Sequence, residues 1–295
     1  MEKVLVTGTT GQLGYDIICE LKKRKIHCVG ADRRQNDDVS FECVTLDITD
    51  QKEVLRRVQE INPTVVIHCA AWTNVDAAED PENLNAVRAV NVEGTRNLAE
   101  ACKKIDAKMI YISTDYVFSG EGTKPWLPDD QDFAPLNVYG QSKLDGEFAV
   151  MENLQKFFIV RIAWVFGKNG KNFVKTMLDI GSTHDTVRVV NDQIGTPTYT
   201  VDLARLLVDM AESEKYGYYH ATNEGGFISW ADFAEEIYRQ AGLQTRVIGV
   251  SSEEYGLSKA RRPFNSRLDK TKLSASGFCP LPTWQDALSR YLKNL

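Results

Sequence analysis

The chain has 295 residues, 43% of them hydrophobic and 26% charged, and this composition excludes an intrinsically disordered protein. At this length we expect two domains or one large α/β unit, with a core large enough to shape a cavity. The 35 basic and 41 acidic residues give a net charge of −6. This charge argues against nucleic-acid binding, because phosphate backbones require clustered positive charge.

Neither a leader peptide nor a membrane span is expected. The first apolar run begins at Val4 without a basic segment before it, and no run approaches the roughly 18 apolar residues that a spanning helix needs. The six cysteines have no Cys-x-x-Cys spacing. We interpret them as reduced core residues of a cytoplasmic protein: Cys19, Cys28, Cys43, Cys69, Cys102 and Cys279.

Short apolar runs alternate with long amphipathic ones through the first 165 residues, which predicts βαβ units and a parallel sheet. Strands are expected at 4–7, 27–31, 42–46, 65–69, 109–113 and 157–164. Helices are expected at 13–25, 51–61, 82–104 and 138–152. Several strands are rich in Val and Ile without alternation, which is typical of a sheet covered on both faces. We therefore predict a doubly wound (Rossmann) NAD(P)-binding domain in residues 1–165.

The rhythm changes after residue 166. The expected elements are helices at 172–180, 201–212, 230–241 and 284–292 and strands at 187–190, 218–221 and 246–250. Residues 166–295 are expected to form mainly a smaller α/β substrate-binding domain, while parts of 186–222 join the first domain. The polar stretch 251–266 contains Gly256 and Pro263 and predicts a long loop, which we interpret as a lid or wall of the substrate site.

Three glycines mark the turn between the first strand and the first helix. Gly8, Gly11 and Gly14 permit a tight turn, a close approach of backbone to a pyrophosphate, and close packing of helix on strand. Ordinary strand-to-helix turns can carry the same glycines. Asp32, however, ends the second expected strand 18 residues after Gly14, at the spacing of a carboxylate that binds the adenosine ribose. Together these residues predict a dinucleotide site.

The residues after the second strand bear on the choice of cofactor. Asp32 alone favours NADH, whereas Arg33 and Arg34 could pair with the 2′-phosphate of NADPH. Use of both NADH and NADPH is therefore our hypothesis, and a solvated surface is the alternative for the two arginines.

Two tyrosine-lysine pairs have a spacing of four residues. Tyr139 and Lys143 follow the fifth expected strand, whereas Tyr255 and Lys259 lie in the late polar loop. A phenol is a poor acid at neutral pH unless a neighbouring ammonium favours its phenolate. Position favours the first pair, because its helix lies beside the expected nicotinamide end of the sheet.

The segment 113–120 closes the fifth expected strand at its carboxyl end, where ligands bind in open α/β sheets. Thr114 could donate a hydrogen bond to a substrate carbonyl beside Tyr139. A Thr-Asp pair also often caps the end of a strand. The register with Tyr139 and Lys143 favours a catalytic role for Thr114.

These residues resemble the extended short-chain dehydrogenase/reductase family, through Thr7-Gly8-x-x-Gly11-x-x-Gly14, Thr114 and Tyr139-x-x-x-Lys143. The resemblance covers essentially the whole chain, and it is strongest to reductases of nucleotide sugars. The segments that carry it lie at 70–79, 113–120, 161–164, 190–198 and 261–266. It implies hydride transfer from NADPH or NADH to C4 of a keto-sugar, with Tyr139 protonating the developing alkoxide.

The resemblance also implies a set of binding residues. Lys143 would hold the nicotinamide ribose and tune Tyr139, and Thr114 would polarise the carbonyl. The implied cofactor site comprises Gly8, Gly11, Gln12, Leu13, Gly14, Asp32, Arg33, Asp47, Ile48, Ala70, Ala71, Thr73, Tyr139 and Lys143, with Asn91 in the supporting region. The implied substrate site comprises Val75, Thr114, Asp115, Tyr116, Tyr139, Trp164 and Arg261.

One negative observation favours reduction over a sibling reaction. The related dehydratases follow the threonine with an Asp-Glu pair that eliminates water, whereas here Thr114-Asp115 is followed by Tyr116. An epimerase or a reductase of another nucleotide sugar would share Tyr139 and Lys143. A cofactor-binding regulatory subunit similar to the partner of methionine adenosyltransferase is the non-enzymatic alternative.

Metal and partner expectations complete the sequence interpretation. Some members of this reductase group bind Mg²⁺ at a dimer interface, and Asp16 falls in a compatible place. No full acidic set accompanies Asp16, and the four histidines lack ligand spacing, so no metal site is assigned. Arg261 and Arg262 lie in the polar loop, where a nucleoside diphosphate would need cationic partners. The expected partners are a nucleotide sugar and, as in that group, a second copy of the chain in a homodimer.

Overall fold

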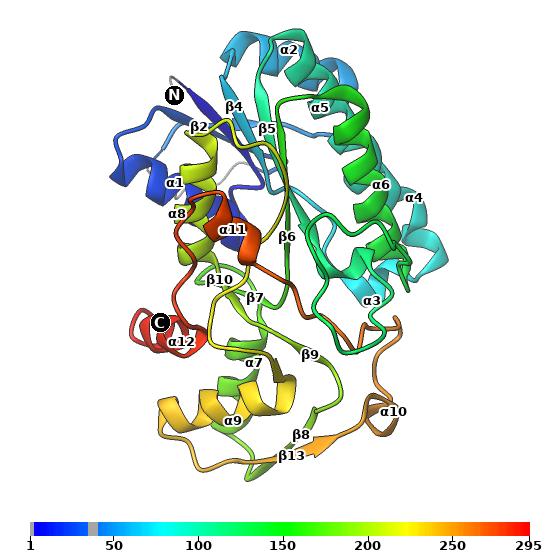
Figure 1. Cartoon of the computed structure of the whole chain (residues 1–295), viewed down its shortest axis with the longest axis vertical. Coiled ribbons are helices and arrows are strands. Elements are labelled where there is room, and N and C mark those ends of the chain that lie inside the picture. The colour runs from blue at the N-terminus through cyan, green and yellow to red at the C-terminus, as the bar shows by residue number, and fades with distance from the viewer. Residues whose placement is uncertain (1–2, 35–40) are drawn as a thin grey trace.

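The computed structural model describes residues 3–34 and 41–295. Its centre is a seven-stranded sheet in the order β11-β6-β5-β4-β1-β2-β3, in which every neighbouring pair is parallel (Figure 1). The strands are β1 (Val4–Thr7), β2 (Cys28–Asp32), β3 (Cys43–Thr45), β4 (Val65–His68), β5 (Lys108–Thr114), β6 (Phe157–Ile162) and β11 (Gly217–His220). This confirms the expected doubly wound sheet.

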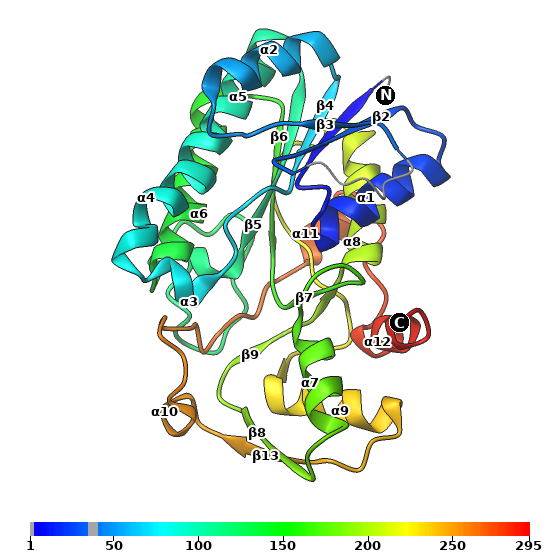
Figure 2. The same ribbon diagram turned by 180° about the vertical axis from the view of Figure 1, so that it is seen from behind.

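Helices cover both faces of this sheet, as Figures 1 and 2 show from opposite sides. One face packs against α1 (Gln12–Lys23) and α8 (Thr200–Ala211), and the other against α2 (Gln51–Ile61), α5 (Thr95–Lys104) and α6 (Val138–Asn153). The chain returns to this sheet late, because α8 packs on α1 and β11 pairs with β6. The short helix α11 (Thr271–Ala275) lies against β11.

A smaller lobe lies beyond the carboxyl edge of the sheet, at the bottom of Figures 1 and 2. It contains α7 (Phe173–Gly181), α9 (Trp230–Ala241) and α12 (Trp284–Leu292), packed around a core that includes Phe166, Phe233 and Tyr291. Its strands pair two by two: β8 (Thr186–Val190) with β13 (Arg246–Val250), β7 (Val165–Phe166) with β10 (Thr198–Tyr199), and β9 (Ile194–Gly195) with β12 (Ile228–Ser229). This is the smaller C-terminal α/β region expected from the sequence.

The expected helix at 82–104 is wrong as a single helix. The segment contains the 3₁₀ turn η1 (Pro81–Asn83), then α4 (Leu84–Arg88), the π-helical turn η2 (Ala89–Gly94) and α5. Asn91 lies inside the π turn, where its side chain accepts a hydrogen bond from Trp72 N and donates to Trp72 O and Ser142 Oγ. Such π turns inside helices are frequent at functional sites. The residues that Asn91 contacts, Trp72 and Ser142, lie far from it in sequence.

Two smaller expectations are also corrected. The strand expected at 157–164 ends at Ile162, because Trp164 has φ = 51°, in the left-handed region that a strand cannot contain. All six cysteines are free, but Cys19 and Cys279 are exposed and are therefore not core residues. Cys28 and Cys102 are buried, and Cys43 and Cys69 are partly buried.

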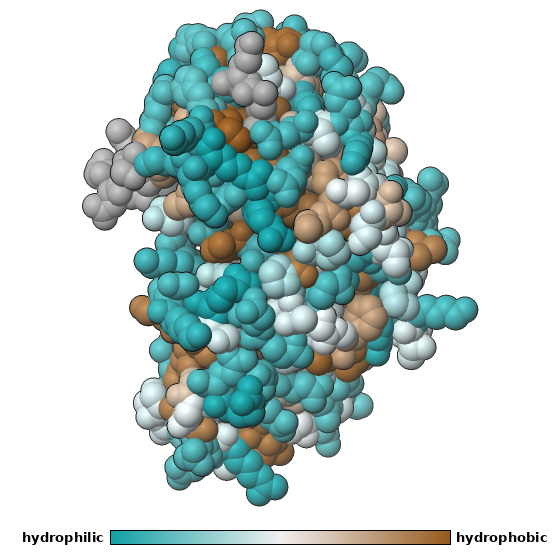
Figure 3. Space-filling view, turned by 60° about the vertical axis from the view of Figure 1, so that its left-hand side comes forward, coloured by the Kyte–Doolittle hydropathy of each residue, from teal (hydrophilic) through white to brown (hydrophobic). Residues whose placement is uncertain are grey.

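The surface agrees with the mixed composition. The face in Figure 3 is mostly hydrophilic, with apolar side chains in small separate groups. Within the part of the chain that the structure describes, no helix combines the length and the apolar character that crossing a membrane requires.

Candidate active site

A cleft of about 760 Å³ opens at the carboxyl edge of the sheet, where β1 and β4 are neighbours. From this pair the strand order continues through β2 and β3 on one side and through β5 and β6 on the other. Ligands bind at such a switch point in open α/β sheets. The cleft is lined by all the residues expected to bind the cofactor: Gly8, Gly11, Gln12, Leu13, Gly14, Asp32, Arg33, Asp47, Ile48, Ala70, Ala71, Thr73, Tyr139 and Lys143. The structure thus gathers this set in one cavity.

The glycine-rich turn is shaped as a cradle for phosphate. Gly8 has φ = 72°, and a Cβ atom there would lie 2.7 Å from Ala70 N. A Cβ atom on Gly14 would lie 2.3 Å from Gly8 O. Gly11 caps α1 without any side chain, and the first turn of α1 has no acidic residue. The N–H groups at this helix end are therefore directed at the cleft, and the residues present fit a pyrophosphate.

Asp32 stands at the end of β2 and is tied to the same turn. Its Oδ2 accepts hydrogen bonds from Thr10 N at 2.9 Å and from Thr10 Oγ1 at 2.8 Å. Arg33 and Arg34 beside it are both exposed, and of the two only Arg33 lines the cleft. The carboxylate and the guanidinium thus share the edge of the cleft where an adenosine ribose fits.

Tyr139 and Lys143 lie on α6, one turn apart, and Thr114 ends the neighbouring strand β5. All three line the cleft. Burial raises the pKa of Tyr139 above its ordinary value, Asp115 raises it further, and the Thr114 hydroxyl opposes the shift. Burial lowers the pKa of Lys143 to about 7, against the opposing charge of Glu147. The Lys143 ammonium lies over the Tyr111 ring, 4.0 Å from its centroid.

Asp115 lines the cleft together with the carboxylates of Asp32 and Asp47. Thr114 Oγ1 donates to Asp115 Oδ1 at 3.0 Å, and Asp115 Oδ2 has no hydrogen-bond partner among the described residues. Burial raises the pKa of this carboxyl to about 6, and the hydroxyls of Ser266 and Thr114 oppose the shift. Asp115 is 2% exposed, so ionisation of its carboxyl carries a desolvation cost that these hydroxyls offset only in part.

A buried ion pair lies directly behind Lys143. Glu147, one turn further along α6, accepts from Arg161 Nε at 2.9 Å and from Arg161 Nη2 at 2.8 Å. Ser113 Oγ donates to the same carboxylate at 2.5 Å. The two charged side chains are 0% and 1% exposed, so the pair supplies a fixed charge arrangement beneath the site. Sequence reasoning could not pair these two residues, because Glu147 lies on α6 and Arg161 on β6.

A second buried network joins the end of β1, before the phosphate turn, to the start of α5. Thr7 Oγ1 accepts from Cys69 N and Ala70 N at 3.2 Å each, so its hydrogen is directed to His68 Nδ1 at 2.7 Å. His68 Nε2 then donates to Thr95 Oγ1 at 3.2 Å. Burial lowers the pKa of His68 to about 3, so this ring is neutral and links two hydroxyls.

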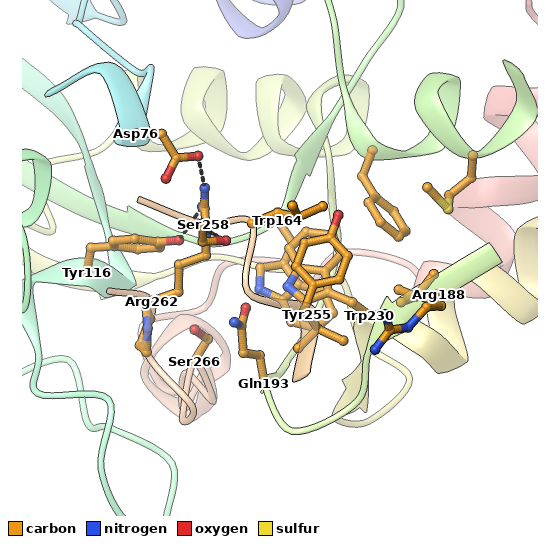
Figure 4. A pocket seen from close by; sticks show the side chains of 16 residues that line it. Asp76, Tyr116, Trp164, Arg188, Gln193, Trp230, Tyr255, Ser258, Arg262 and Ser266 are labelled. Carbon is orange, nitrogen blue, oxygen red and sulfur yellow. Dashed lines mark hydrogen bonds and ion pairs between the residues drawn. The ribbon is translucent and has the colours of Figure 1, made fainter. Parts of the chain in front are cut away.

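A smaller cavity of about 390 Å³ adjoins the cleft, between the sheet edge and the small lobe (Figure 4). Tyr116 lines both cavities, and its ring meets the Tyr139 ring edge-on with 5.6 Å between centroids. Trp164 stacks on Trp230 at 3.8 Å between centroids. The left-handed backbone at Trp164 turns the chain from β6 into this wall.

The polar loop at 251–266 forms the other wall and contains the short helix α10 (Ser252–Tyr255). Arg262 Nη2 pairs with Asp76 Oδ2 at 2.6 Å, and Arg262 Nη1 donates to Tyr116 Oη at 3.1 Å (Figure 4). Arg261 is exposed and lines neither cavity. The arginine that lines this wall is therefore Arg262, which is adjacent in sequence to the expected Arg261.

The remaining expected substrate residues divide between the cavities. Val75, Thr114 and Asp115 line the larger cleft, and Trp164 lines the smaller cavity. Tyr255 also lines the smaller cavity, while Lys259 pairs with Asp80 and is directed away from it. Tyr255 and Lys259 therefore do not form a pair like Tyr139 and Lys143. Trp230, Gln193 and Arg188 also line the smaller cavity and were not assigned to a site from the sequence.

Asp16 has a structural role here. It is buried on α1, accepts a hydrogen bond from Thr200 Oγ1 at 2.5 Å, and has its pKa raised by burial. Within residues 3–34 and 41–295, no group of three His, Cys, Asp or Glu side chains is arranged to hold a metal ion.

Comparison with known proteins finds relatives over the full length of the chain. A family model described as RmlD substrate binding domain matches residues 1–295. The spore coat polysaccharide biosynthesis protein SpsK of Bacillus subtilis (strain 168) is 37% identical over 293 residues, covering 99% of this chain and 98% of that protein. The dTDP-4-dehydrorhamnose reductase of Streptomyces griseus is 40% identical over 291 residues, covering 97% and 91%. A crystal structure of dTDP-4-dehydrorhamnose reductase from Bacillus anthracis in complex with NADP has a TM-score of 0.91 at 39% identity, covering 100% of this chain and 99% of that one.

The parallel sheet, the glycine-rich cradle and the Thr-Tyr-Lys set define an NAD(P)-dependent reductase of the extended short-chain dehydrogenase/reductase type. Within that class, the full-length match assigns the family. The chain belongs to the RmlD family.

Proposed function

We propose that this chain reduces the C4 ketone of dTDP-4-dehydro-L-rhamnose to give dTDP-L-rhamnose, with NADPH or NADH as the reductant. The observation that carries the proposal is the adjacency of two cavities that share Tyr116, with Tyr139 edge-on to it. The larger cavity fits a dinucleotide and the smaller one fits the nucleotide sugar. The resemblance to dTDP-4-dehydrorhamnose reductases over the full length supports the choice of sugar.

The glycine-rich cradle would hold the pyrophosphate of the cofactor, and the edge formed by Asp32 and Arg33 would hold the adenosine ribose. Asp32 favours the free hydroxyls of NADH, while Arg33 offers a cation to the 2′-phosphate of NADPH. The bound cofactor supplies a hydride to C4. Lys143 would bind the nicotinamide ribose hydroxyls from α6, on the same side of the cleft as Tyr139.

Tyr139 would donate its phenolic proton to the C4 oxygen as negative charge develops there. The carbon gains the hydride and the oxygen gains the proton, so a ketone becomes an alcohol with no further co-reactant. A phenol with a raised pKa is a reluctant acid, so the Lys143 ammonium must stabilise its phenolate. The Thr114 hydroxyl can add to this only when its hydrogen is not donated to Asp115. Lys143 has a pKa of about 7 and lies over Tyr111, and a negatively charged cofactor would raise that pKa and favour the ammonium.

The smaller cavity offers the groups that a nucleoside diphosphate requires. Trp164 and Trp230 present stacked aromatic surface, and Arg262 presents a guanidinium that matches phosphate geometry. Arg262 is held by Asp76 and Tyr116, so it is oriented before the substrate arrives. The substrate diphosphate would compete with Asp76 for this cation.

The test is a turnover assay with purified protein, dTDP-4-dehydro-L-rhamnose generated in place, and either NADPH or NADH. We expect near-ultraviolet absorbance of the reduced nicotinamide to fall by one equivalent per product. Product formation without net oxidation would indicate an epimerase. Cofactor binding without oxidation by this or another 4-keto nucleotide sugar would overturn the reductase and favour a regulatory subunit.

A further inference from the structure

A loop of the small lobe reaches the cofactor cleft. Residues 167–171 connect β7 to α7, and Gly170 and Lys171 line the cleft together with the glycine-rich turn. Gln12, the first residue of α1, donates from Nε2 to Lys171 O at 3.5 Å. A Cβ atom on Gly170 would lie 3.8 Å from Gln12 Cγ. The loop therefore lies against the helix end that faces the phosphate cradle.

Contacts with the small lobe and with α1 hold this loop in place. Asn172 Nδ2 donates to Gly167 O at 2.8 Å, to Tyr291 Oη at 3.1 Å and to Gln12 Oε1 at 2.9 Å. Lys175 Nζ donates to Gly170 O at 3.0 Å. These bonds hold the carbonyl groups of the loop without using the Lys171 side chain. Within the described ranges, Lys171 forms no ion pair with a carboxylate.

Cations from three separate elements line the part of the cleft that the structure describes. The cations that line it are Arg33 after β2, Lys143 on α6, and Lys171 beside the start of α1. Arg33 belongs to the adenosine end, and Lys143 belongs to the catalytic end. Lys171 lies beside the first residue of α1, where the helix N-terminus already favours negative charge. A pyrophosphate bound beside this helix end would place its negative charges near the Lys171 side chain.

We propose that Lys171 binds the cofactor pyrophosphate from the small lobe, opposite the glycine-rich turn. Cofactor binding is then shared between the two lobes, because the cradle belongs to the sheet and the lysine to the loop before α7. Lys171 is a binding residue and takes no part in the chemical step. This inference rests on the proposed use of a dinucleotide cofactor, and its test does not depend on the sugar.

The test measures dissociation constants for NADPH, NADH and ADP-ribose by isothermal titration, without any substrate. The variants are Lys171→Gln and Lys171→Arg, and the matched control is Lys168→Gln, which removes an exposed lysine from the same loop that does not line the cleft. We expect Lys171→Gln to weaken the binding of all three ligands about tenfold, and less at high salt, because a charge-assisted contact from an exposed side chain is lost. Lys171→Arg should restore most of the affinity.

Each outcome separates the inference from the proposed function. Equal affinities for Lys171→Gln, Lys168→Gln and the unsubstituted protein would overturn the role of Lys171 while leaving the reductase intact. A loss of affinity confined to NADPH would overturn the pyrophosphate assignment. All three ligands carry the pyrophosphate, whereas only NADPH carries the 2′-phosphate. If the unsubstituted protein bound none of the three ligands, both the inference and the proposed function would fall.

Discussion

Thr114 donates its hydroxyl hydrogen to the Asp115 carboxylate, with 3.0 Å between Oγ1 and Oδ1. Thr114 Oγ1 also accepts a hydrogen bond from Tyr116 N at 3.3 Å. A hydroxyl has one hydrogen, so Thr114 cannot donate to a substrate carbonyl while this bond is kept. Asp115 therefore competes with the substrate for the Thr114 proton, and protonation of Asp115 would end that competition.

The buried carboxyl gives the first prediction. Burial raises the pKa of Asp115 from 3.8 to about 6, so the folded state binds this proton more tightly than the unfolded chain does. The resulting loss of folding stability is absent at pH values below 3.8, the pKa in the unfolded chain, and fully present well above pH 6. We expect Asp115→Asn to raise the free energy of unfolding by about 1 to 3 kcal/mol near pH 7.5 and to change it little near pH 4.

Urea unfolding at the two pH values measures this difference. Asp132→Asn, at an exposed carboxylate, serves as the control and should show no such pH dependence. If Asp115→Asn changed the stability equally at both pH values, ionisation of Asp115 would not be the cause.

The second prediction concerns the proton donor. Replacing Tyr139 with Phe removes the phenolic proton while keeping a ring of almost the same size in the partly buried position. We expect kcat to fall at least about a hundredfold, the range for loss of a general acid, with the cofactor dissociation constant largely unchanged. Steady-state kinetics together with cofactor titration separates the two effects. Tyr255→Phe is the control, because Tyr255 lines only the smaller cavity, and a larger loss of kcat there would reverse the assignment.

Local spacing explains why much of the site could be predicted from the sequence. Gly8, Gly11 and Gly14 fix a turn by their own backbone requirements, and Asp32 follows from the end of the next strand. The choice of Tyr139 over Tyr255 followed from chain order, because carboxyl ends of parallel strands meet at one edge. These features depend on residues close in sequence or on topology alone.

Contacts between distant segments could not be predicted in the same way. The π turn at Asn91 depends on Trp72 and Ser142, and the wall of the smaller cavity depends on Trp164 meeting Trp230. In an irregular loop, no periodicity decides which of two adjacent arginines faces the cavity. That distinction required the ion pair between Arg262 and Asp76.

The two arginines give the third prediction. Arg262 lines the smaller cavity and is oriented by Tyr116, whereas Arg261 is exposed. We expect Arg262→Gln to raise KM for the nucleotide sugar about tenfold or more, because charge-assisted contacts to a diphosphate are lost, with a smaller effect on kcat. Arg261→Gln should leave KM nearly unchanged. Initial-rate measurements at saturating cofactor test both variants, and a larger effect at Arg261 would contradict the orientation described here.

The last prediction concerns the ion pair beneath Lys143. Arg161 is fully buried, and its guanidinium carbon lies 4.9 Å from the Phe118 ring centroid and 4.7 Å from that of Tyr218. Glu147→Gln would leave this cation without a neutralising partner, so we expect the free energy of unfolding to fall by about 3 to 5 kcal/mol. Because Glu147 also holds up the pKa of Lys143, its loss should lower that pKa further below about 7.

A lower Lys143 pKa moves its deprotonation to more acidic pH, so activity that requires the ammonium should decline at lower pH than in the unsubstituted protein. Urea unfolding and the pH profile of kcat/KM provide independent readouts. Glu152→Gln is the matched control, since it removes an exposed carboxylate from the same helix whose partner is Arg96. We expect that surface change to cost less than about 1 kcal/mol and to leave the profile in place. A Glu147→Gln variant with an unshifted profile would show that the ion pair stabilises the fold without acting on Lys143.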